Sequence, residues 1–268
     1  MTWYLREAGS TEDTDFFDEF QWKKRTPLFD KDGTVTINEI GEIRELIWSQ
    51  HKQDMPTNKM VVGWFNLQPL FAKYEGMGNG VLMRNSTNTR QAASDIKMRM
   101  TSGSWRYFKD GSLQEEDYVP EGKVAMVFSA FAGHNSTVNG RSFILIERES
   151  AKSTMAIILN TLQEAAFWYK YARSKFFTTL CIGRLGGHNA QAQTYQDVPL
   201  FSFTESDPID WSKSIPEIDE QLIAHFGLEE HREYILSAAI PYARELGQEY
   251  LDRLEDGGVD TSGINDWY

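Results

Sequence analysis

The sequence predicts an α+β fold with a mixed, β-rich central region, a strand-helix-helix unit and a helical C-terminus. Short β-branched and aromatic runs broken by Gly, Asn and Ser fill residues 60–131, which is typical of strands. Apolar residues at helical spacing recur after residue 38, between residues 155 and 177, and after residue 214. With 41% hydrophobic and 13% aromatic residues in 268, the chain can bury a substantial core.

The N-terminal region combines acidic and aromatic residues. Residues 13–29 are typical of a short amphipathic helix or an extended docking segment. Asp32 and Gly33 predict a turn, followed by a strand at 34–37 and a helix from about Asn38. The "DKDG" stretch does not start a calcium loop. Counted from Asp30, glycine is the fourth residue (Gly33) and also the twelfth (Gly41), whereas an EF-hand loop has glycine sixth and glutamate twelfth.

Four runs predict the central strands: "MVVGWFNLQPLF", "NGVLMRNS", "GSWRYF" and "KVAMVFSAF". "SFILIE" predicts a further strand, and 149–153 a turn. A helix then presents Met155, Ile158, Leu159 and Leu162 on one face and continues into a second helical stretch. In that stretch we expect the aromatic residues to pack in the core and the basic ones to face outward. The residues are Phe167, Trp168, Phe176 and Phe177 for the core, and Lys170, Arg173 and Lys175 for the outward side.

Residues 194–236 predict a short aromatic strand, "VPLFSF", an acidic turn and a helix. We expect the apolar residues that follow the strand to bury against it. They are Trp211, Ile218, Leu222, Phe226 and Leu228. The predicted organisation is an acidic, helical segment at 1–59, a β-rich domain at 60–240, and an acidic helix and tail at 241–268.

The net charge of −12 is unevenly distributed. Residues 80–110 contain six basic and two acidic side chains, and residues 141–184 contain seven basic and three acidic ones. Residues 197–268 contain seventeen acidic side chains against four basic ones. The overall acidity disfavours binding to nucleic acid, because that binding requires Lys and Arg to neutralise phosphates. The basic middle of the chain nevertheless keeps nucleic acid possible as a partner.

Cys181 is the single cysteine and cannot form an intrachain disulfide, which fits a reducing compartment. The first residues lack the basic start and apolar run of a signal peptide, and no apolar stretch reaches about 18 residues. We therefore expect a cytoplasmic protein without a membrane partner. No motif indicates a metal or another cofactor.

Several short sequence motifs, the first in the "SFILIE" strand, resemble the C-terminal target-recognition region of a family of DNA-modifying enzymes. The family comprises TaqI-like and type IIG adenine-N6 DNA methyltransferases and restriction-modification enzymes. The resemblance covers about residues 123–240. The residues that carry it are Phe143–Ile146, Leu159–Thr161, Lys175–Phe177, Val198, Pro199, Asp210, Trp211, Ile218, Asp219, Leu222 and Phe226–Leu228.

This resemblance implies a region that holds duplex DNA and reads bases. Catalysis is not implied, because the Asn/Asp-Pro-Pro-Tyr/Phe loop and the glycine-rich loop for the methyl donor do not occur in the sequence. We therefore expect a non-catalytic DNA-binding protein of a restriction-modification or phage system. Duplex DNA is the expected partner, with a methyltransferase or nuclease subunit as a second.

Candidate DNA-binding residues follow from the basic stretches and from two "GHN" loops. Arg can contact phosphates or guanine, while Asn and Gln can pair with adenine. The glycine-led segment "GGHNAQAQ" is uncharged and rich in amides, so it is the best candidate for base reading, with Arg184 at its base. The candidates are Arg84, Arg90, Arg99, Arg106, His134, Asn135, Arg173, Lys175, Arg184, His188, Asn189, Gln191 and Gln193.

Two alternatives remain open. The acidic C-terminal region could let the protein occupy a partner's DNA channel as an anti-restriction mimic, or serve in a virion or assembly component. A Mg-dependent restriction endonuclease is the other alternative, since Glu121 and Lys123 have the Glu-x-Lys spacing and Glu115, Glu116 and Asp117 precede them. Convergence of the two basic stretches on one surface would favour DNA, and a continuous acidic face would favour mimicry.

Overall fold

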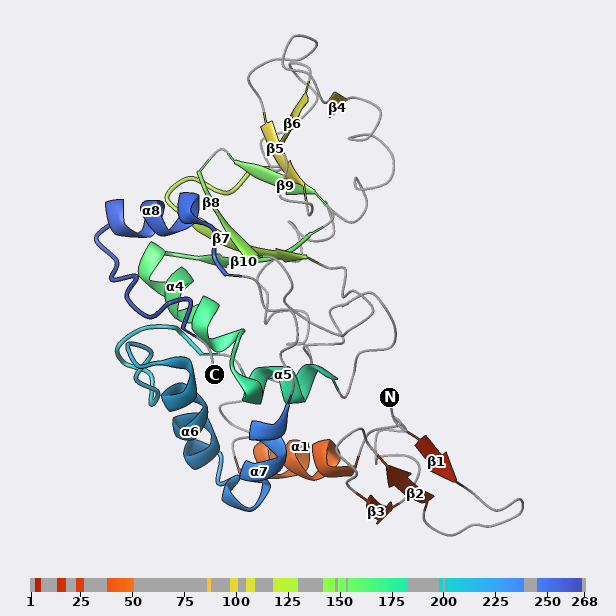
Figure 1. The fold of residues 1–268 in the computed structure, drawn as a ribbon. Helices are drawn as coiled ribbons and strands as arrows, with labels where there is room; N and C mark the ends of the chain where they lie inside the picture. The colour runs from red at the N-terminus through yellow and green to blue at the C-terminus, as the bar shows by residue number, and fades with distance from the viewer. Residues whose placement is uncertain are drawn as a thin grey trace.

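The computed structural model in Figure 1 has an α+β fold. The structure describes residues 3–5, 14–17, 23–26, 38–50, 86–87, 97–100, 105–108, 118–129, 142–147, 149–152, 154–182, 198–199, 201–238 and 245–266.

The described strands form three sheets. One contains β1 (Trp3–Leu5), β2 (Thr14–Phe17) and β3 (Lys23–Thr26) in sequence order. The second has the order β10-β7-β8, formed by β7 (Val124–Ser129), β8 (Ser142–Ile146) and β10 (Thr154–Leu159). The third has the order β4-β6-β5-β9, formed by β4 (Ser86–Thr87), β5 (Lys97–Met100), β6 (Trp105–Phe108) and β9 (Ser150–Lys152).

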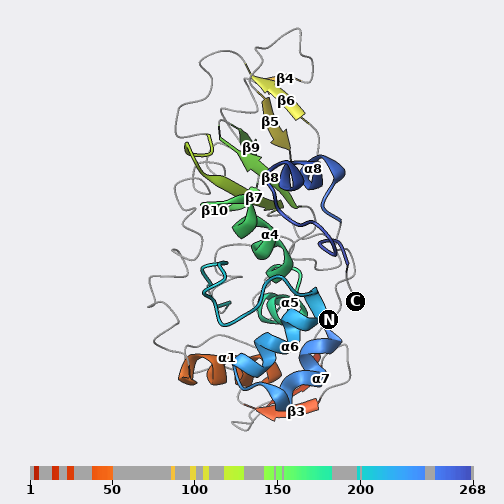
Figure 2. The same cartoon turned by 90° about the vertical axis from the view of Figure 1, so that its left-hand side faces the viewer.

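The described helices are α1 (Asn38–Gln50), α4 (Leu162–Tyr171), α5 (Lys175–Ile182), α6 (Ile215–His225), α7 (Arg232–Ser237) and α8 (Gln248–Asp256), with a 3-10 turn, η4 (Glu229–His231). Figures 1 and 2 place α4 between the β10-β7-β8 sheet and α5, with α8 beside β8 and with α6, α7 and α1 beyond α5. The two central sheets thus lie at one end of the structure, and α1, α5, α6 and α7 lie at the other end with the β1-β2-β3 sheet.

The helix predicted over Met155–Leu159 is wrong, because these residues form β10. β10 pairs antiparallel with β7 over its whole length, from Thr154 opposite Ser129 to Leu159 opposite Val124. A short, β-branched run suits a strand that is half or fully buried, and periodicity alone does not separate it from a buried helix. The turn expected at 149–153 is also wrong in part, because Ser150–Lys152 form β9.

Two other predictions need correction. Within residues 14–26 the described segments are strands β2 and β3, so the extended interpretation holds there and the helical one does not. Residues 198–199 and 201–203 form no strand in the structure. Phe203 has a positive φ of 58°, a conformation that interrupts an extended strand.

Other expected elements are confirmed. α1 begins at Asn38 and buries Ile40, Ile43 and Ile47, all at most 1% exposed. "SFILI" is β8, and "WRYF" is β6. The four aromatic residues expected to pack in the core are buried. The predicted strand at 34–37 and the run "MVVGWFNLQPLF" lie outside the described residues.

A single hydrophobic cluster joins buried residues of α1, the β10-β7-β8 sheet, α4 to α7 and α8. Both predicted domain boundaries, near residues 59 and 240, lie outside the described residues, so the division into three segments stays a prediction. Among the described helices, none combines the length and apolar character needed to cross a membrane.

Candidate nucleic-acid interface

An aromatic cluster formed by Tyr171, Phe201, Phe203 and Trp211 fixes the segment that follows residue 198. The Trp211 ring centroid lies 5.5 Å from that of Tyr171, 5.1 Å from Phe201 and 5.4 Å from Phe203. The Tyr171 hydroxyl donates to the carbonyl of Pro199 at 2.8 Å. The edge-to-face contacts of Trp211 with Tyr171 and Phe201 add stability beyond burial, so the cluster holds residues 201–211 against α4.

Asp207 organises the turn inside this segment. Its carboxylate accepts hydrogen bonds from the backbone amides of Ser202, Phe203 and Thr204, at 2.7–3.3 Å. It also accepts from Trp211 Nε1 at 2.7 Å. The acidic turn expected between the aromatic residues and α6 is therefore built on one carboxylate, which accepts from three backbone amides and one indole N–H.

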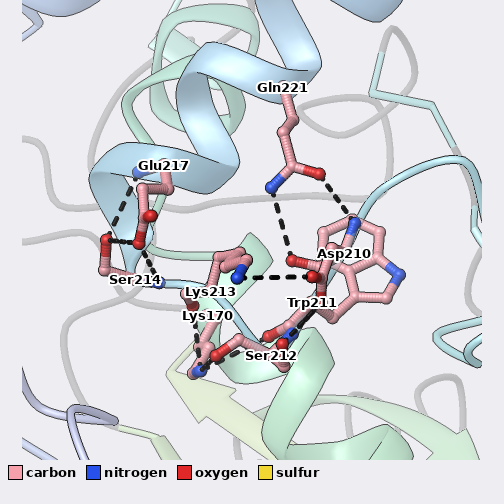
Figure 3. Close-up of polar contacts among 8 residues, drawn as sticks. All are labelled: Lys170, Asp210, Trp211, Ser212, Lys213, Ser214, Glu217 and Gln221. Atoms are coloured by element: carbon pink, nitrogen blue, oxygen red, sulfur yellow. Dashed lines mark hydrogen bonds and ion pairs between the residues drawn. The ribbon is translucent and has the colours of Figure 1, made fainter.

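Lys170 joins α4 to the start of α6. Its ammonium group donates to the carbonyls of Trp211, Ser212 and Lys213, at 3.3, 3.1 and 3.0 Å (Figure 3). Burial lowers the pKa of Lys170, and nearby carboxylates, Asp260 first, act in the opposite direction. The side chain is 6% exposed, so the expectation that Lys170 faces outward is wrong.

We expect Lys170→Met to lower the free energy of unfolding by about 1–3 kcal/mol, because it leaves three carbonyls without this donor. Lys213→Met is the matched control, since its side chain is 51% exposed and its ammonium lies 3.8 Å from Asp210. The control should change stability by less than about 0.5 kcal/mol. Urea unfolding of both variants measures the difference, and equal effects would remove the structural role given to Lys170.

The start of α6 has a capping box, visible in Figure 3. The Ser214 hydroxyl accepts from the Glu217 amide, and the Glu217 carboxylate accepts from the Ser214 amide. Gln221 adds bonds to the backbone of Asp210 at 2.8 and 3.4 Å. A Ser-x-x-Glu spacing before an apolar run is a helix-start signal that is readable in the sequence.

Asp219 joins α6 to α5. Its carboxylate, 0% exposed, accepts from the backbone amides of Lys175 at 2.9 Å and Phe176 at 2.7 Å. The Ser174 hydroxyl accepts from the Phe177 amide at 3.0 Å. The first three amides of α5 thus have acceptors. Asp219, more than forty positions later in the sequence, accepts from two of them, and the nearby Ser174 hydroxyl accepts from the third.

Arg173 is interior, contrary to the expectation that it faces outward. It is 1% exposed, its guanidinium lies 3.6 Å from the Tyr169 ring centroid, and Nη1 donates to the Ser142 hydroxyl at 3.2 Å. Burial lowers the pKa of Arg173 to about 10. An arginine that is held inside in this way supports the packing of α4 on β8 and is not positioned for a surface phosphate.

Lys175 is half-buried and also makes a structural contact. Its ammonium donates to the carbonyl of Leu236, in the last turn of α7, at 2.5 Å. A cation at a helix C-terminus is favourable. Burial lowers the pKa of Lys175, while Asp219 raises it. Arg173, between α4 and α5, and Lys175, the first residue of α5, therefore both have roles within the fold.

The two basic stretches meet in the β4-β6-β5-β9 sheet. Arg99 lies on β5, and Arg106 on the neighbouring β6. β9 pairs with β5 in parallel, and its Lys152 is the register partner of Met100. Arg106 is the register partner of Met98, so Arg106 and Lys152 occupy positions on the same side of the sheet and Arg99 a position on the other. Neighbouring strands are about 4.8 Å apart, so backbone positions from residues 80–110 and 141–184 lie side by side.

The other candidate residues lie outside the described residues. They are Arg84, Arg90, His134, Asn135, Arg184, His188, Asn189, Gln191 and Gln193. The segment 183–197 follows α5, whose Leu180 and Cys181 are 0% exposed, and precedes Val198, which is 4% exposed. Both flanks of the candidate base-reading segment are therefore fixed in the core.

The Glu-x-Lys pair lies just before β7. Glu121 is exposed in a turn, and the Lys123 ammonium donates to Asn160 Oδ1 at 2.6 Å. Glu115, Glu116 and Asp117 lie outside the described residues. Within the described ranges, no group of three or more His, Cys, Asp or Glu residues is arranged to hold a metal ion.

Comparisons of this chain with protein-family models, with curated proteins and with solved structures give no match.

Proposed function

We propose that the protein binds duplex DNA as a non-catalytic, target-recognition-like protein of a restriction-modification or phage system. The observation that carries the proposal is the pairing of β5, β6 and β9. It brings Arg106 and Lys152, from two separate basic stretches, to register positions on the same side of one sheet, because their partners on β5, Met98 and Met100, are two residues apart. A concentration of Lys and Arg supplies the phosphate contacts on which DNA affinity depends.

The positions that carry the resemblance to the target-recognition region support the proposal in a second way. Asp219 caps α5, Trp211 lies in the aromatic cluster, and Phe226 stacks on Phe176 with ring centroids 5.4 Å apart. Phrases that are far apart in the sequence thus form one scaffold. A rigid scaffold with variable segments between its elements is the usual arrangement for recognition.

Base reading is assigned to the segment 183–197, with His188, Asn189, Gln191 and Gln193 as the reading residues and Arg184 as a phosphate contact. Its flanks are fixed by the buried end of α5 and by the Tyr171–Pro199 hydrogen bond. Asn and Gln can form bidentate pairs with adenine in the major groove.

Selection of bound sequences from randomised duplex DNA tests this assignment. We expect the wild-type protein to enrich a motif. Asn189→Ala and Gln191→Ala should each weaken binding to that motif by about 1–3 kcal/mol while leaving binding to random duplex nearly unchanged. Gln163→Ala, an exposed position on α4, serves as the control. Failure of the wild type to enrich any motif would contradict base reading by this segment.

Phosphate contacts are assigned to the basic sheet. Arg106→Gln and Lys152→Gln should weaken binding to all sequences alike, and each should reduce the slope of log K against log salt by about one. Arg173 and Lys175, the other basic candidates with described side chains, are not suitable for this test, because their side chains make structural contacts within the fold. Unchanged affinity in the double variant would exclude the sheet as a phosphate-binding surface.

An acidic interaction surface is the second candidate function. The observation that favours it is the exposure of carboxylates along the C-terminal helical region. Exposed positions include Glu220, Glu229, Glu230, Glu233, Glu249, Asp252, Glu255 and Asp256. Absence of DNA binding together with inhibition of a restriction enzyme would favour a DNA mimic over a DNA-binding protein.

A further inference from the structure

The two sides of the β4-β6-β5-β9 sheet are occupied by different kinds of residue. Positions alternate between the two sides along a strand, and register partners on neighbouring strands share a side. Arg106 and Lys152 occupy the side to which the duplex contacts are assigned. The positions of the opposite side, which we call the aromatic side, are Thr87, Lys97, Arg99, Trp105, Tyr107 and Ala151.

On the aromatic side, each basic position is directly opposite an aromatic one. Lys97 on β5 is the register partner of Tyr107 on β6, and Arg99 is the register partner of Trp105. The two outer strands contribute only a threonine and an alanine to this side. Two basic–aromatic pairs, adjacent to each other on β5 and β6, therefore form its centre.

The charge of the sheet is opposite to that of the whole chain. Its described strands contain Lys97, Arg99, Arg106 and Lys152 and no acidic residue. The chain as a whole has 39 acidic residues and a net charge of −12. The aromatic side is thus complementary in charge to a polyanion, and its aromatic positions suit a polyanion that has flat rings of its own.

Unpaired nucleotides have both properties. In a duplex the faces of the bases are stacked on one another, so aromatic side chains reach them only where a strand is single or a base has left the stack. Aromatic residues on a sheet can stack unpaired bases of any type, while neighbouring Lys and Arg contact the phosphates. An acidic peptide would match the charge but would not use the pairing of each cation with an aromatic position.

We infer that the aromatic side binds single-stranded DNA, with Trp105 and Tyr107 stacking unpaired bases and Lys97 and Arg99 contacting phosphates. The inference goes beyond the proposed function and does not require it. The positions lie on the opposite side of the sheet from Arg106 and Lys152, and their ligand is a strand without a complement.

Anisotropy titrations with a fluorescent oligothymidine of about 12 nucleotides test the inference, since this length is within the usual range of single-strand sites. We expect Trp105→Leu and Tyr107→Leu each to weaken binding roughly 5- to 100-fold. Phe108→Leu is the matched control, because Phe108 lies on the same strand and its position is on the other side of the sheet. It should change the affinity by less than about 2-fold, and all three variants should bind duplex DNA as the wild type does.

A second probe tests the stacking without any substitution. An oligonucleotide of the same length and charge that carries abasic sites offers phosphates but no bases. We expect the wild-type protein to bind it at least about 5-fold more weakly than oligothymidine. Polyglutamate of equal charge should displace oligothymidine poorly.

The outcomes that would overturn the inference differ from those that would overturn the proposed function. Lack of oligothymidine binding by the wild type, or equal binding of the abasic probe, would remove the single-strand site. Ready displacement by polyglutamate would assign the aromatic side to acidic peptides. Variants of Trp105 and Tyr107 that lose stability but keep the affinity would assign both residues to packing. Duplex binding in the same buffer would still support the proposed function, and its absence beside intact oligothymidine binding would remove that function alone.

Discussion

Trp211→Ala should lower the free energy of unfolding by about 3–5 kcal/mol, the range for emptying a buried aromatic site. Trp211 is 1% exposed and contacts the rings of Tyr171, Phe201 and Phe203. The substitution also removes the indole donor from the Asp207 carboxylate. Chemical denaturation followed by circular dichroism at 222 nm measures the loss.

Trp211→Phe separates the contribution of ring packing in the aromatic cluster from that of the indole hydrogen bond to Asp207. It keeps an aromatic ring in the cluster and removes only the indole nitrogen and part of the volume, so it should cost clearly less than the alanine variant. An alanine variant as stable as the wild type would contradict the role of the aromatic cluster in holding residues 201–211. Loss of DNA binding at unchanged stability would assign Trp211 to the interface instead.

Asp219→Ala should lower the free energy of unfolding by about 3–5 kcal/mol, because two amides of α5 lose a charged acceptor inside the core. Lys175 and Phe176 donate these amides, and Asp219 is 0% exposed. The amide of Asp219→Asn keeps one acceptor oxygen, so this variant should have an intermediate stability. Urea unfolding of both proteins provides the measurement.

Asp252→Ala is the control for the Asp219 series. Asp252 is exposed on α8 and accepts one side-chain bond from Gln248. Its loss should change stability by less than about 0.5 kcal/mol. If Asp219→Ala cost no more than Asp252→Ala, the carboxylate would not be the connection between α6 and α5.

Much of the local structure is predictable because it depends on short-range patterns. The spacing of Ile40, Ile43 and Ile47 defines the buried face of α1, and Ser214 with Glu217 marks the start of α6. The same reasoning failed at residues 155–159. A five-residue apolar run is compatible with both the helical and the strand period. Pairing with β7, about thirty positions earlier in the sequence, makes this run a strand.

The roles of the charged residues were the least predictable part. Helical spacing placed Lys170 and Arg173 among outward-facing residues, yet both are buried. Lys170 is inside because the carbonyls of residues 211–213 satisfy its ammonium, and Arg173 because Tyr169 and Ser142 receive its guanidinium. Such partners come from distant segments, so a count of basic residues along the chain overestimates the charge available to DNA.

The placement of Arg106 and Lys152 in one sheet was also beyond sequence reasoning, which identified two basic stretches without relating them. Their placement depends on the parallel pairing of β5 with β9, which joins segments about fifty residues apart. Composition therefore identified the two basic stretches, and the strand order shows where they meet.

An anisotropy titration of the wild-type protein with duplex DNA at two salt concentrations tests the central claim most directly. The account predicts saturable binding at about 0.05 M salt that weakens strongly at about 0.2 M, since phosphate contacts release counterions. Absence of binding at the lower salt concentration, or an affinity that does not depend on salt, would contradict it.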